Sequence, residues 1–142
     1  MSNLMNIIGR LPVSFVKGNG AYLQDDQGRQ YLDALSGIAV CGLGHAHPKI
    51  AKALSEQGQT LLHTSNLYDI PHQTLLAKRL CTLSGMDNAF FCNSGAEANE
   101  AAIKLARLKG NRAGNLSPTV VVVDGGFHGR TMATLTATGN RK

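Results

Sequence analysis

The change of pattern between Ala89 and Val123 restricts the fold of this chain more than any other feature of the sequence. Ala89 to Cys92 form a short, mostly bulky run of the kind found in a buried strand. From Ala98 onward, small and apolar residues recur at the i, i+3, i+4, i+7 spacing of a packed helix face. Thr119 to Val123 are mostly β-branched, which suits a strand covered on both faces. The pattern therefore predicts a βαβ unit.

The connection between the two predicted strands is long enough for them to be parallel. It contains 25 residues, 93–117, whereas a parallel crossover needs about a dozen or more. Parallel strands end at the same edge of a sheet, so the loops 93–98 (NSGAEA) and 124–131 (DGGFHGRT) are expected to lie side by side. In open α/β sheets this carboxyl edge is where ligands bind.

The first of these loops has the composition of an anion site. A helix that begins there offers unpaired backbone N–H groups and the positive end of its dipole. Gly95 and Ala96 leave the approach free of bulk, and Ser94 adds a hydroxyl donor. A phosphate is the ligand that this arrangement favours, although Ser94 can equally be a simple N-cap. The loop is neither a P-loop nor a dinucleotide fingerprint.

The second loop contains groups that a phosphate-bearing aromatic ligand would need. Phe127 can stack on a flat ring, and Arg130 can bind a carboxylate through two parallel hydrogen bonds. The alternatives are core packing for Phe127 and a surface charge for Arg130. Taken together, the two loops predict a binding site at one edge of the sheet.

The first part of the chain reads as short strands followed by helices. Glycine turns at 18–20 and 26–28 separate short runs typical of a β-meander. A helix is predicted to begin at Pro48 and to end at Gly58.

A second helix is predicted to begin at Pro71 and to end at Gly85. The composition changes directly after it, from a meander with helices to the strand–helix–strand pattern. This change predicts a domain boundary between an amino-terminal segment, 1–86, and the start of a large α/β domain, 87–142.

The charge and hydropathy patterns exclude two classes of partner. The net charge of +5 arises late in the chain: residues 1–71 carry five basic and five acidic groups, and residues 72–142 carry nine and four. Its densest cluster, 104–112, contains no aromatic residue and falls near a helix end, where cations complement the dipole. No apolar run approaches the roughly 18 residues of a membrane span. We expect neither nucleic acid nor membrane as a partner.

The cysteine and histidine patterns favour a reducing compartment and no metal. The three cysteines are odd in number and have no CxxC spacing, and the first residues do not resemble a secretory signal, so we expect a cytoplasmic protein. Cys92 is predicted to be a small buried apolar side chain. His45 and His47 are two residues apart, but no nearby ligand completes a metal site, so they are predicted to serve a loop and a helix cap.

Long motifs in this sequence resemble one known family. The stretch FFCNSGAEANEAAIKLAR, followed by FHGRT, resembles the class-III pyridoxal-phosphate-dependent aminotransferases, in particular their acetylornithine branch. The stretches GNGAYLQDDQGRQYLDALSGIAVCGLGHAHPKI and TSNLYDIPHQTLLAKRL are similar to the same family, so the resemblance covers essentially the whole chain. It implies an α/β fold, the PLP-dependent transferase fold type I, with the amino-terminal segment and the first parallel βαβ unit of the large domain.

The resemblance also implies roles for individual residues. Gly95 and Ala96, with Ser94 beside them, would hold the phosphate of pyridoxal 5'-phosphate through backbone N–H groups. Phe127 would stack on the pyridine ring, and Arg130 would bind the α-carboxylate of the substrate. The implied reaction moves an amino group between N-acetylornithine and 2-oxoglutarate, as in arginine biosynthesis, in a homodimeric enzyme. Ile38 stands where ornithine aminotransferases tend to have tyrosine, which favours the acetylornithine branch.

The family places its Schiff-base lysine and the carboxylate that partners the ring nitrogen well downstream of these motifs. No lysine of this chain matches that position, so we identify no catalytic residue and expect a fragment that is inactive alone. Two alternatives stay open. One is another class-III enzyme that acts on ω-amino substrates or a semialdehyde; the other is a non-catalytic α/β module that binds a phosphorylated ligand. The absorbance of a bound cofactor would distinguish them.

Overall fold

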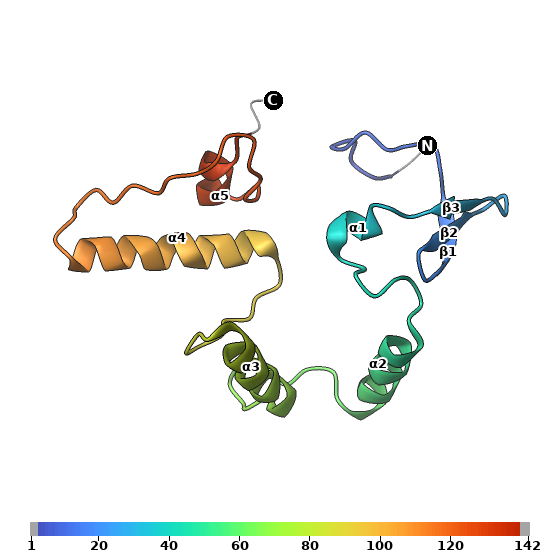
Figure 1. Ribbon diagram of the computed structural model, residues 1–142, viewed down its shortest axis with the longest axis horizontal. Coiled ribbons are helices and arrows are strands. Elements are labelled where there is room, and N and C mark those ends of the chain that lie inside the picture. Colours follow the sequence, from blue (N-terminus) through green and yellow to red (C-terminus); the bar gives the residue numbers. More distant parts are fainter. Residues whose placement is uncertain (1–2, 140–142) are drawn as a thin grey trace. The chain divides into compact units, whose positions relative to one another are not determined.

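The computed structural model of the protein describes residues 3–139 (Figure 1). Its elements, in chain order, are β1 (Phe15–Asn19), β2 (Tyr22–Asp25), β3 (Gln30–Leu32), α1 (Ser36–Ala39), α2 (Pro48–Thr60), α3 (Pro71–Ser84), α4 (Gly95–Arg112) and α5 (Met132–Ala137). The chain forms two compact units, which are divided in sequence between Tyr68 and Asp69. The predicted domain boundary between residues 86 and 87 concerns the start of a larger domain rather than contacts within this chain, so it stays a prediction.

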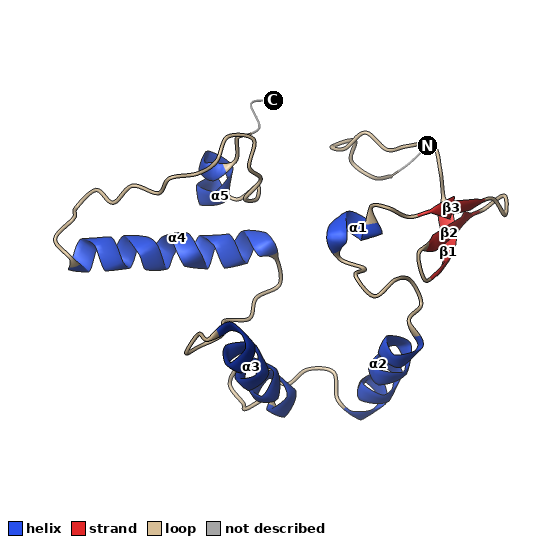
Figure 2. Ribbon diagram, in the orientation of Figure 1, coloured by secondary structure: helices blue, strands red, loops and turns tan. Residues whose placement is uncertain are grey.

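The three strands form the predicted meander (Figure 2). The sheet has the order β1-β2-β3, and both pairs are antiparallel. Gly20 (φ 55°) and Gly28 (φ 81°) lie in the two turns with positive φ values, which glycine adopts without a steric penalty. The strands and turns expected from the sequence are therefore confirmed.

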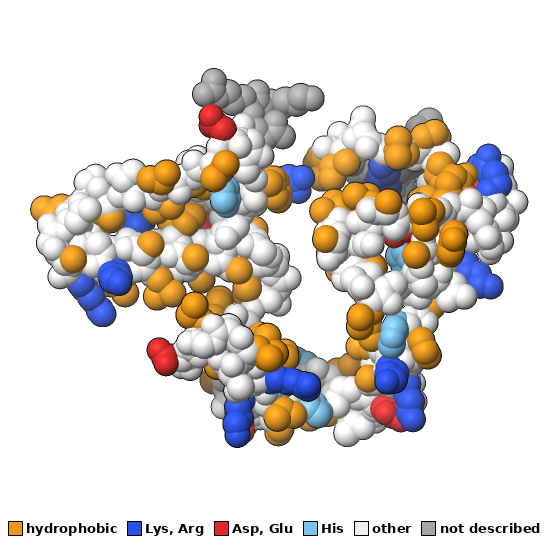
Figure 3. Space-filling view, in the orientation of Figure 1, with side chains coloured by type: hydrophobic (Ala, Val, Ile, Leu, Met, Phe, Trp, Pro, Cys, Tyr) orange, Lys and Arg blue, Asp and Glu red, His pale blue; other side chains and the backbone are white. Residues whose placement is uncertain are grey.

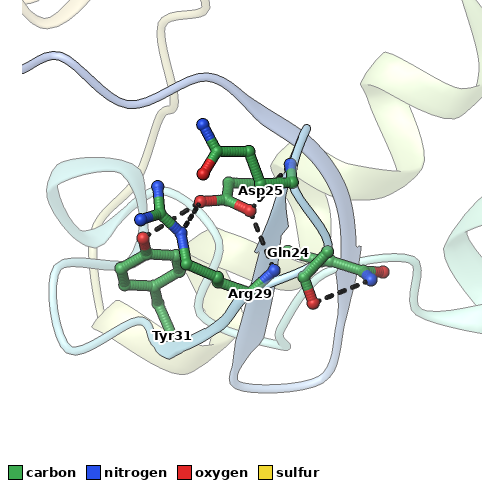
Figure 4. A network of polar contacts seen from close by, with 6 residues as sticks. Gln24, Asp25, Arg29 and Tyr31 are labelled. Carbon is green, nitrogen blue, oxygen red and sulfur yellow. Dashed lines mark hydrogen bonds and ion pairs between the residues drawn. The ribbon is translucent and has the colours of Figure 1, made fainter.

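A buried carboxylate holds the second turn of the meander in place (Figure 4). Asp25 is 2% exposed and accepts hydrogen bonds from Arg29 Nε (2.7 Å), Arg29 N (2.8 Å), Tyr31 Oη (3.0 Å) and Gln27 N (3.0 Å). Burial raises the pKa of Asp25, but these hydrogen bonds outweigh it and leave the pKa below its ordinary value. Both oxygen atoms of the carboxylate accept hydrogen bonds, and the guanidinium of Arg29 provides the opposite charge, as a buried carboxylate requires.

The segment after β3, residues 33–45, is held by a contact between the side chains of its two end residues, Asp33 and His45. Asp33 Oδ2 lies 2.6 Å from His45 Nε2, and Asp33 Oδ1 accepts the N–H of Ser36 at 2.8 Å. The hydrogen bond from His45 lowers the pKa of Asp33. A Cβ atom at Gly18 would lie 2.6 Å from the Cβ of His45, so only glycine fits beneath this histidine. His45 thus serves the loop, as predicted.

Between these anchors, α1 is a left-handed turn. Ser36, Gly37, Ile38 and Ala39 have φ values of 50°, 63°, 62° and 62°. Left-handed backbone costs a non-glycine residue about 1–2 kcal/mol, and a β-branched residue such as Ile38 adopts it only when its surroundings enforce it. The contact between Asp33 and His45 therefore offsets part of the conformational free energy that this turn costs.

The helices α2 and α3 begin at the predicted prolines. Helix α3 ends where Gly85 adopts φ 71°, as expected for a glycine C-cap. Helix α2 continues two residues past Gly58 and ends at Thr60, so its predicted end is wrong. Gly58 keeps a negative φ value and is tolerated inside the helix at a cost of about 1 kcal/mol.

Helix α4 confirms the helical part of the predicted βαβ unit, whereas the flanking strands are absent from the described residues. All strands of residues 3–139 belong to the meander, and 89–92 and 119–123 are neither helix nor strand. A strand exists only when a neighbour completes its hydrogen-bond ladder, and neither segment has one in this part of the chain. Their parallel pairing therefore stays a prediction.

The described residues contain no buried hydrophobic side chain. Large apolar groups are visible over the whole face shown in Figure 3, and the exposed fractions of Phe90 and Val121 are 71% and 92%. Cys92 is also exposed, so the prediction of a buried thiol is wrong, because no neighbouring strand covers its segment. Within residues 3–139, no helix combines the length and the apolar character needed to span a membrane.

Candidate functional site

The start of α4 is closed by a variant of the capping box, in which Glu97 accepts from the N–H of Asn93 instead of the N–H of the N-cap residue Ser94. Glu97 N donates to Ser94 Oγ at 3.2 Å, and Glu97 Oε2 accepts from Asn93 N at 2.7 Å and from Ser94 Oγ at 3.2 Å. Hydrogen bonds from the side chain and backbone of Asn93 and from Ser94 lower the pKa of Glu97. Ser94 is therefore an N-cap, the alternative that the sequence had left open. Its predicted contact with a phosphate stays a prediction.

The capping box leaves the next two donors of the helix free. In the described part of the chain, the N–H groups of Gly95 and Ala96 donate to no protein acceptor. A Cβ atom placed on Gly95 would meet no atom within 4 Å, so the approach to these N–H groups is open. Free N–H groups at the positive end of an 18-residue helix are the donors that an anion requires.

The connection after α4 returns along the helix and brings the second predicted loop to this terminus (Figure 1). An open hollow of about 490 Å³ lies between them, a volume in the range of small-molecule sites. It is lined by Gly95, Ala96, Asn99, Phe127, His128, Gly129, Arg130 and Thr131. The structure thus brings together four of the five residues predicted from the sequence; Ser94 lies directly before them as the N-cap.

Phe127 and Arg130 contact each other at this hollow. The Arg130 Cζ atom lies 5.2 Å from the centre of the Phe127 ring, a cation–π distance. Phe127 is 64% exposed, so it is not a core residue in this structure. Among residues 3–139, Arg130 forms no ion pair with an acidic side chain. Its guanidinium is therefore available to a carboxylate ligand.

Gly129 lies where the returning loop approaches α4 most closely. It has a φ value of 132°, and a Cβ atom there would lie 2.6 Å from Thr134 Oγ1 and 2.8 Å from the Cβ of Ala96. Both the backbone conformation and the close approach require glycine.

Gly129→Ala is expected to displace the loop from α4, because the new methyl group overlaps a fully buried threonine and the helix. Overpacking of this kind costs about 1–3 kcal/mol, so thermal unfolding of the full-length enzyme should begin at a lower temperature. Gly42→Ala is the matched control, since Gly42 has open space and no positive φ value. Equal unfolding temperatures for the two variants would contradict the prediction.

Three polar residues of this site were not identified from the sequence. Glu97 completes the capping box, and the S-x-x-E pattern at 94–97 was the available signal. Asn99 Nδ2 donates to the His128 carbonyl oxygen at 2.8 Å, and Glu100 Oε1 accepts from Thr131 Oγ1 and from Ala133 N. No spacing rule marks Asn99 and Glu100, because their partners lie about thirty residues away in the sequence.

The family profile described as "Aminotransferase class-III" matches residues 7–142, nearly the entire chain. The chain belongs to the class-III aminotransferases. Its fold is accordingly part of the PLP-dependent transferase fold type I, as expected.

Three relatives show which members of the family this chain is similar to. The acetylornithine aminotransferase of Nitrosomonas europaea is 68% identical over 142 residues, which is 100% of this chain and 36% of that protein. The crystal structure of N-acetylornithine aminotransferase from Stenotrophomonas maltophilia K279a matches with a TM-score of 0.76 and 43% identity, over 83% of this chain and 33% of that one. The ornithine aminotransferase from Toxoplasma gondii ME49 matches with a TM-score of 0.89 and 27% identity, over 97% and 33%. This class-III chain thus spans about a third of the length of the relatives it matches.

Proposed function

We propose that the enzyme containing this sequence moves an amino group between N-acetylornithine, or a similar ω-amino substrate, and 2-oxoglutarate, with pyridoxal 5'-phosphate as cofactor. The observation that carries the proposal is the hollow at the start of α4. Two backbone N–H groups, an exposed aromatic ring and a guanidinium with no acidic partner among the described residues converge there. These are the groups that a phosphorylated aromatic cofactor and a carboxylate substrate require.

The residues at the hollow fit pyridoxal phosphate. The N–H groups of Gly95 and Ala96 would bind its phosphate at the positive end of α4. The exposed ring of Phe127 would stack on the pyridine ring and exclude water from that side. When bound, the cofactor would supply an electron-withdrawing ring that stabilises negative charge at the substrate carbon that bears the reacting amino group.

Arg130 would orient the substrate through its α-carboxylate. Its planar guanidinium presents two parallel donors that match both carboxylate oxygens, and no acidic side chain of the described residues competes for it. In N-acetylornithine the reacting amino group is on the δ-carbon, so the α-carboxylate lies at the far end of the substrate. The C5 carboxylate of 2-oxoglutarate lies at a similar distance from the reacting carbonyl carbon, so one arginine can serve both halves of a transamination.

The choice of N-acetylornithine rests on the relatives and on one residue. Relatives named acetylornithine aminotransferase are 50–68% identical to this chain, whereas the ornithine aminotransferase of Toxoplasma gondii is 27% identical. Ile38, in place of a tyrosine, favours the same branch. Arginine biosynthesis is the pathway that this substrate implies.

We further propose a cytoplasmic homodimer. Cys41, Cys81 and Cys92 are all free thiols, which supports a reducing compartment. The exposed apolar side chains of both units support extensive burial against further protein, of which a second copy would be part.

Gly95→Leu in the full-length enzyme is expected to weaken cofactor binding by about tenfold or more, since it blocks charge-assisted hydrogen bonds to the phosphate. The fold should persist, because the site around a Cβ at Gly95 is empty. Fluorescence titration of pyridoxal phosphate into the cofactor-free enzyme measures the affinity. Gly58→Leu, in α2, is the matched control in another helix. Unchanged affinity in Gly95→Leu would count against the assignment of the phosphate site.

A further inference from the structure

The loop that presents Phe127 and Arg130 is attached to α4 by few polar contacts. Among the described residues, the hydrogen bonds between α4 and 119–139 all involve the side chains of Asn99 and Glu100. Consecutive residues of a helix project about 100° apart, and these two reach different points of the connection. Asn99 binds the carbonyl of His128, and Glu100 binds Thr131. The pair therefore brackets Gly129 and Arg130.

The loop and α5 are tied to each other independently of α4. His128 N donates to Thr138 Oγ1 at 3.1 Å, and Thr131 N donates to Thr134 Oγ1 at 3.0 Å. Thr134 is fully buried in this structure. The loop and α5 can consequently move as one piece, and the contacts of Asn99 and Glu100 decide where that piece lies against the start of α4.

Glu100 also provides a charge at the start of α5. Its Oε1 atom accepts from the Thr131 hydroxyl and from the N–H of Ala133 at 3.3 Å. The hydrogen bond from Thr131, with the backbone donors of α5, lowers the pKa of Glu100. An ionised carboxylate near a helix start is favourable, although an amide oxygen can accept the same hydrogen bonds.

We propose that Asn99 and Glu100 are positioning residues that set the distance between the anion-binding N–H groups of Gly95 and Ala96 and the guanidinium of Arg130. This inference rests on the proposed function for its consequence in catalysis, but not for the contacts themselves. The cofactor phosphate and the substrate carboxylate bind at these two places, so cofactor and substrate meet in the reactive geometry only at one separation, and a displacement of about 1 Å can cost a hundredfold in rate.

The test compares Glu100→Ala, Glu100→Gln and Asn99→Ala in the full-length enzyme. Glu100→Ala and Asn99→Ala are expected to raise the KM for N-acetylornithine by about tenfold or more, with a smaller change in kcat. Glu100→Gln retains an acceptor oxygen and is expected to stay close to wild type. The controls are Glu56→Ala, whose side chain is exposed, and Asn111→Ala, in the last turn of α4.

A second measurement uses the cofactor-free protein. Amide hydrogen exchange over 127–134 should be faster in Glu100→Ala than in wild type or in Glu100→Gln. If Glu100→Ala fails to fold, Thr131→Val removes the same hydrogen bond from the other side and is expected to give the same result. Unchanged hydrogen exchange and an unchanged KM in the alanine variants would overturn the proposal. Changes in Glu100→Gln as large as those in Glu100→Ala would overturn it as well. A wild-type protein that binds no cofactor would instead refute the proposed function, while the exchange experiment still decides this inference.

Discussion

A purified protein that consists only of residues 1–142 is expected to show no transaminase turnover with pyridoxal phosphate. None of the eight described residues that line the hollow is a lysine, and the reaction needs a lysine to hold the cofactor and to move a proton. The same preparation is expected to be oligomeric or poorly soluble. Its described residues bury no hydrophobic side chain, and the valine run at 120–123 is exposed along its length.

Turnover assays, absorbance and sedimentation check this prediction directly. After borohydride treatment, peptide mapping should find no single lysine that carries the cofactor. The full-length enzyme, prepared and assayed in parallel, is the control for cofactor and substrate quality. A stable monomer of residues 1–142 with measurable turnover and one modified lysine would contradict the prediction.

Arg130→Ala in the full-length enzyme is expected to lower kcat/KM for N-acetylornithine and for 2-oxoglutarate by about a hundredfold or more, because two charge-assisted hydrogen bonds to the carboxylate are lost. Arg130→Lys keeps the positive charge but not the planar pair of donors, so we expect an intermediate loss. Steady-state kinetics with both substrates provide the measurement.

Two comparisons separate this role from a general loss of structure. In the first half-reaction, followed by the absorbance of the cofactor without 2-oxoglutarate, an amine substrate without an α-carboxylate should react nearly as well with Arg130→Ala as with wild type. Arg112→Ala, at the end of α4, should leave both reactions unchanged. If the carboxylate-free amine loses as much activity as N-acetylornithine, Arg130 acts through the loop and not through the substrate.

The site was largely predictable from the sequence because its main features are local. The small residues of the turn before α4 and the prolines and glycines at helix ends determine backbone geometry within a few residues. Phe127 and Arg130 were placed beside Gly95 by the crossover argument, and the hollow brings them together. They meet there without the predicted strands, through the contacts of Asn99 and Glu100.

Features that depend on distant partners were not predictable. The strands expected at 89–92 and 119–123 need a neighbouring strand, and the alternation of residues cannot show whether one is present. The exposure of Cys92 has the same cause. The left-handed turn α1 contradicts local preference altogether, since Ile38 and Ala39 favour extended or right-handed backbone.

The left-handed turn has a consequence for the order in which the first unit folds. No local tendency of residues 36–39 promotes such a turn, so it can form only after Asp33 and His45 have met across the meander. The turn should therefore be absent from the folding transition state and appear among the last steps. Substitutions at Ile38 would then alter the rate of unfolding and leave the rate of folding nearly unchanged.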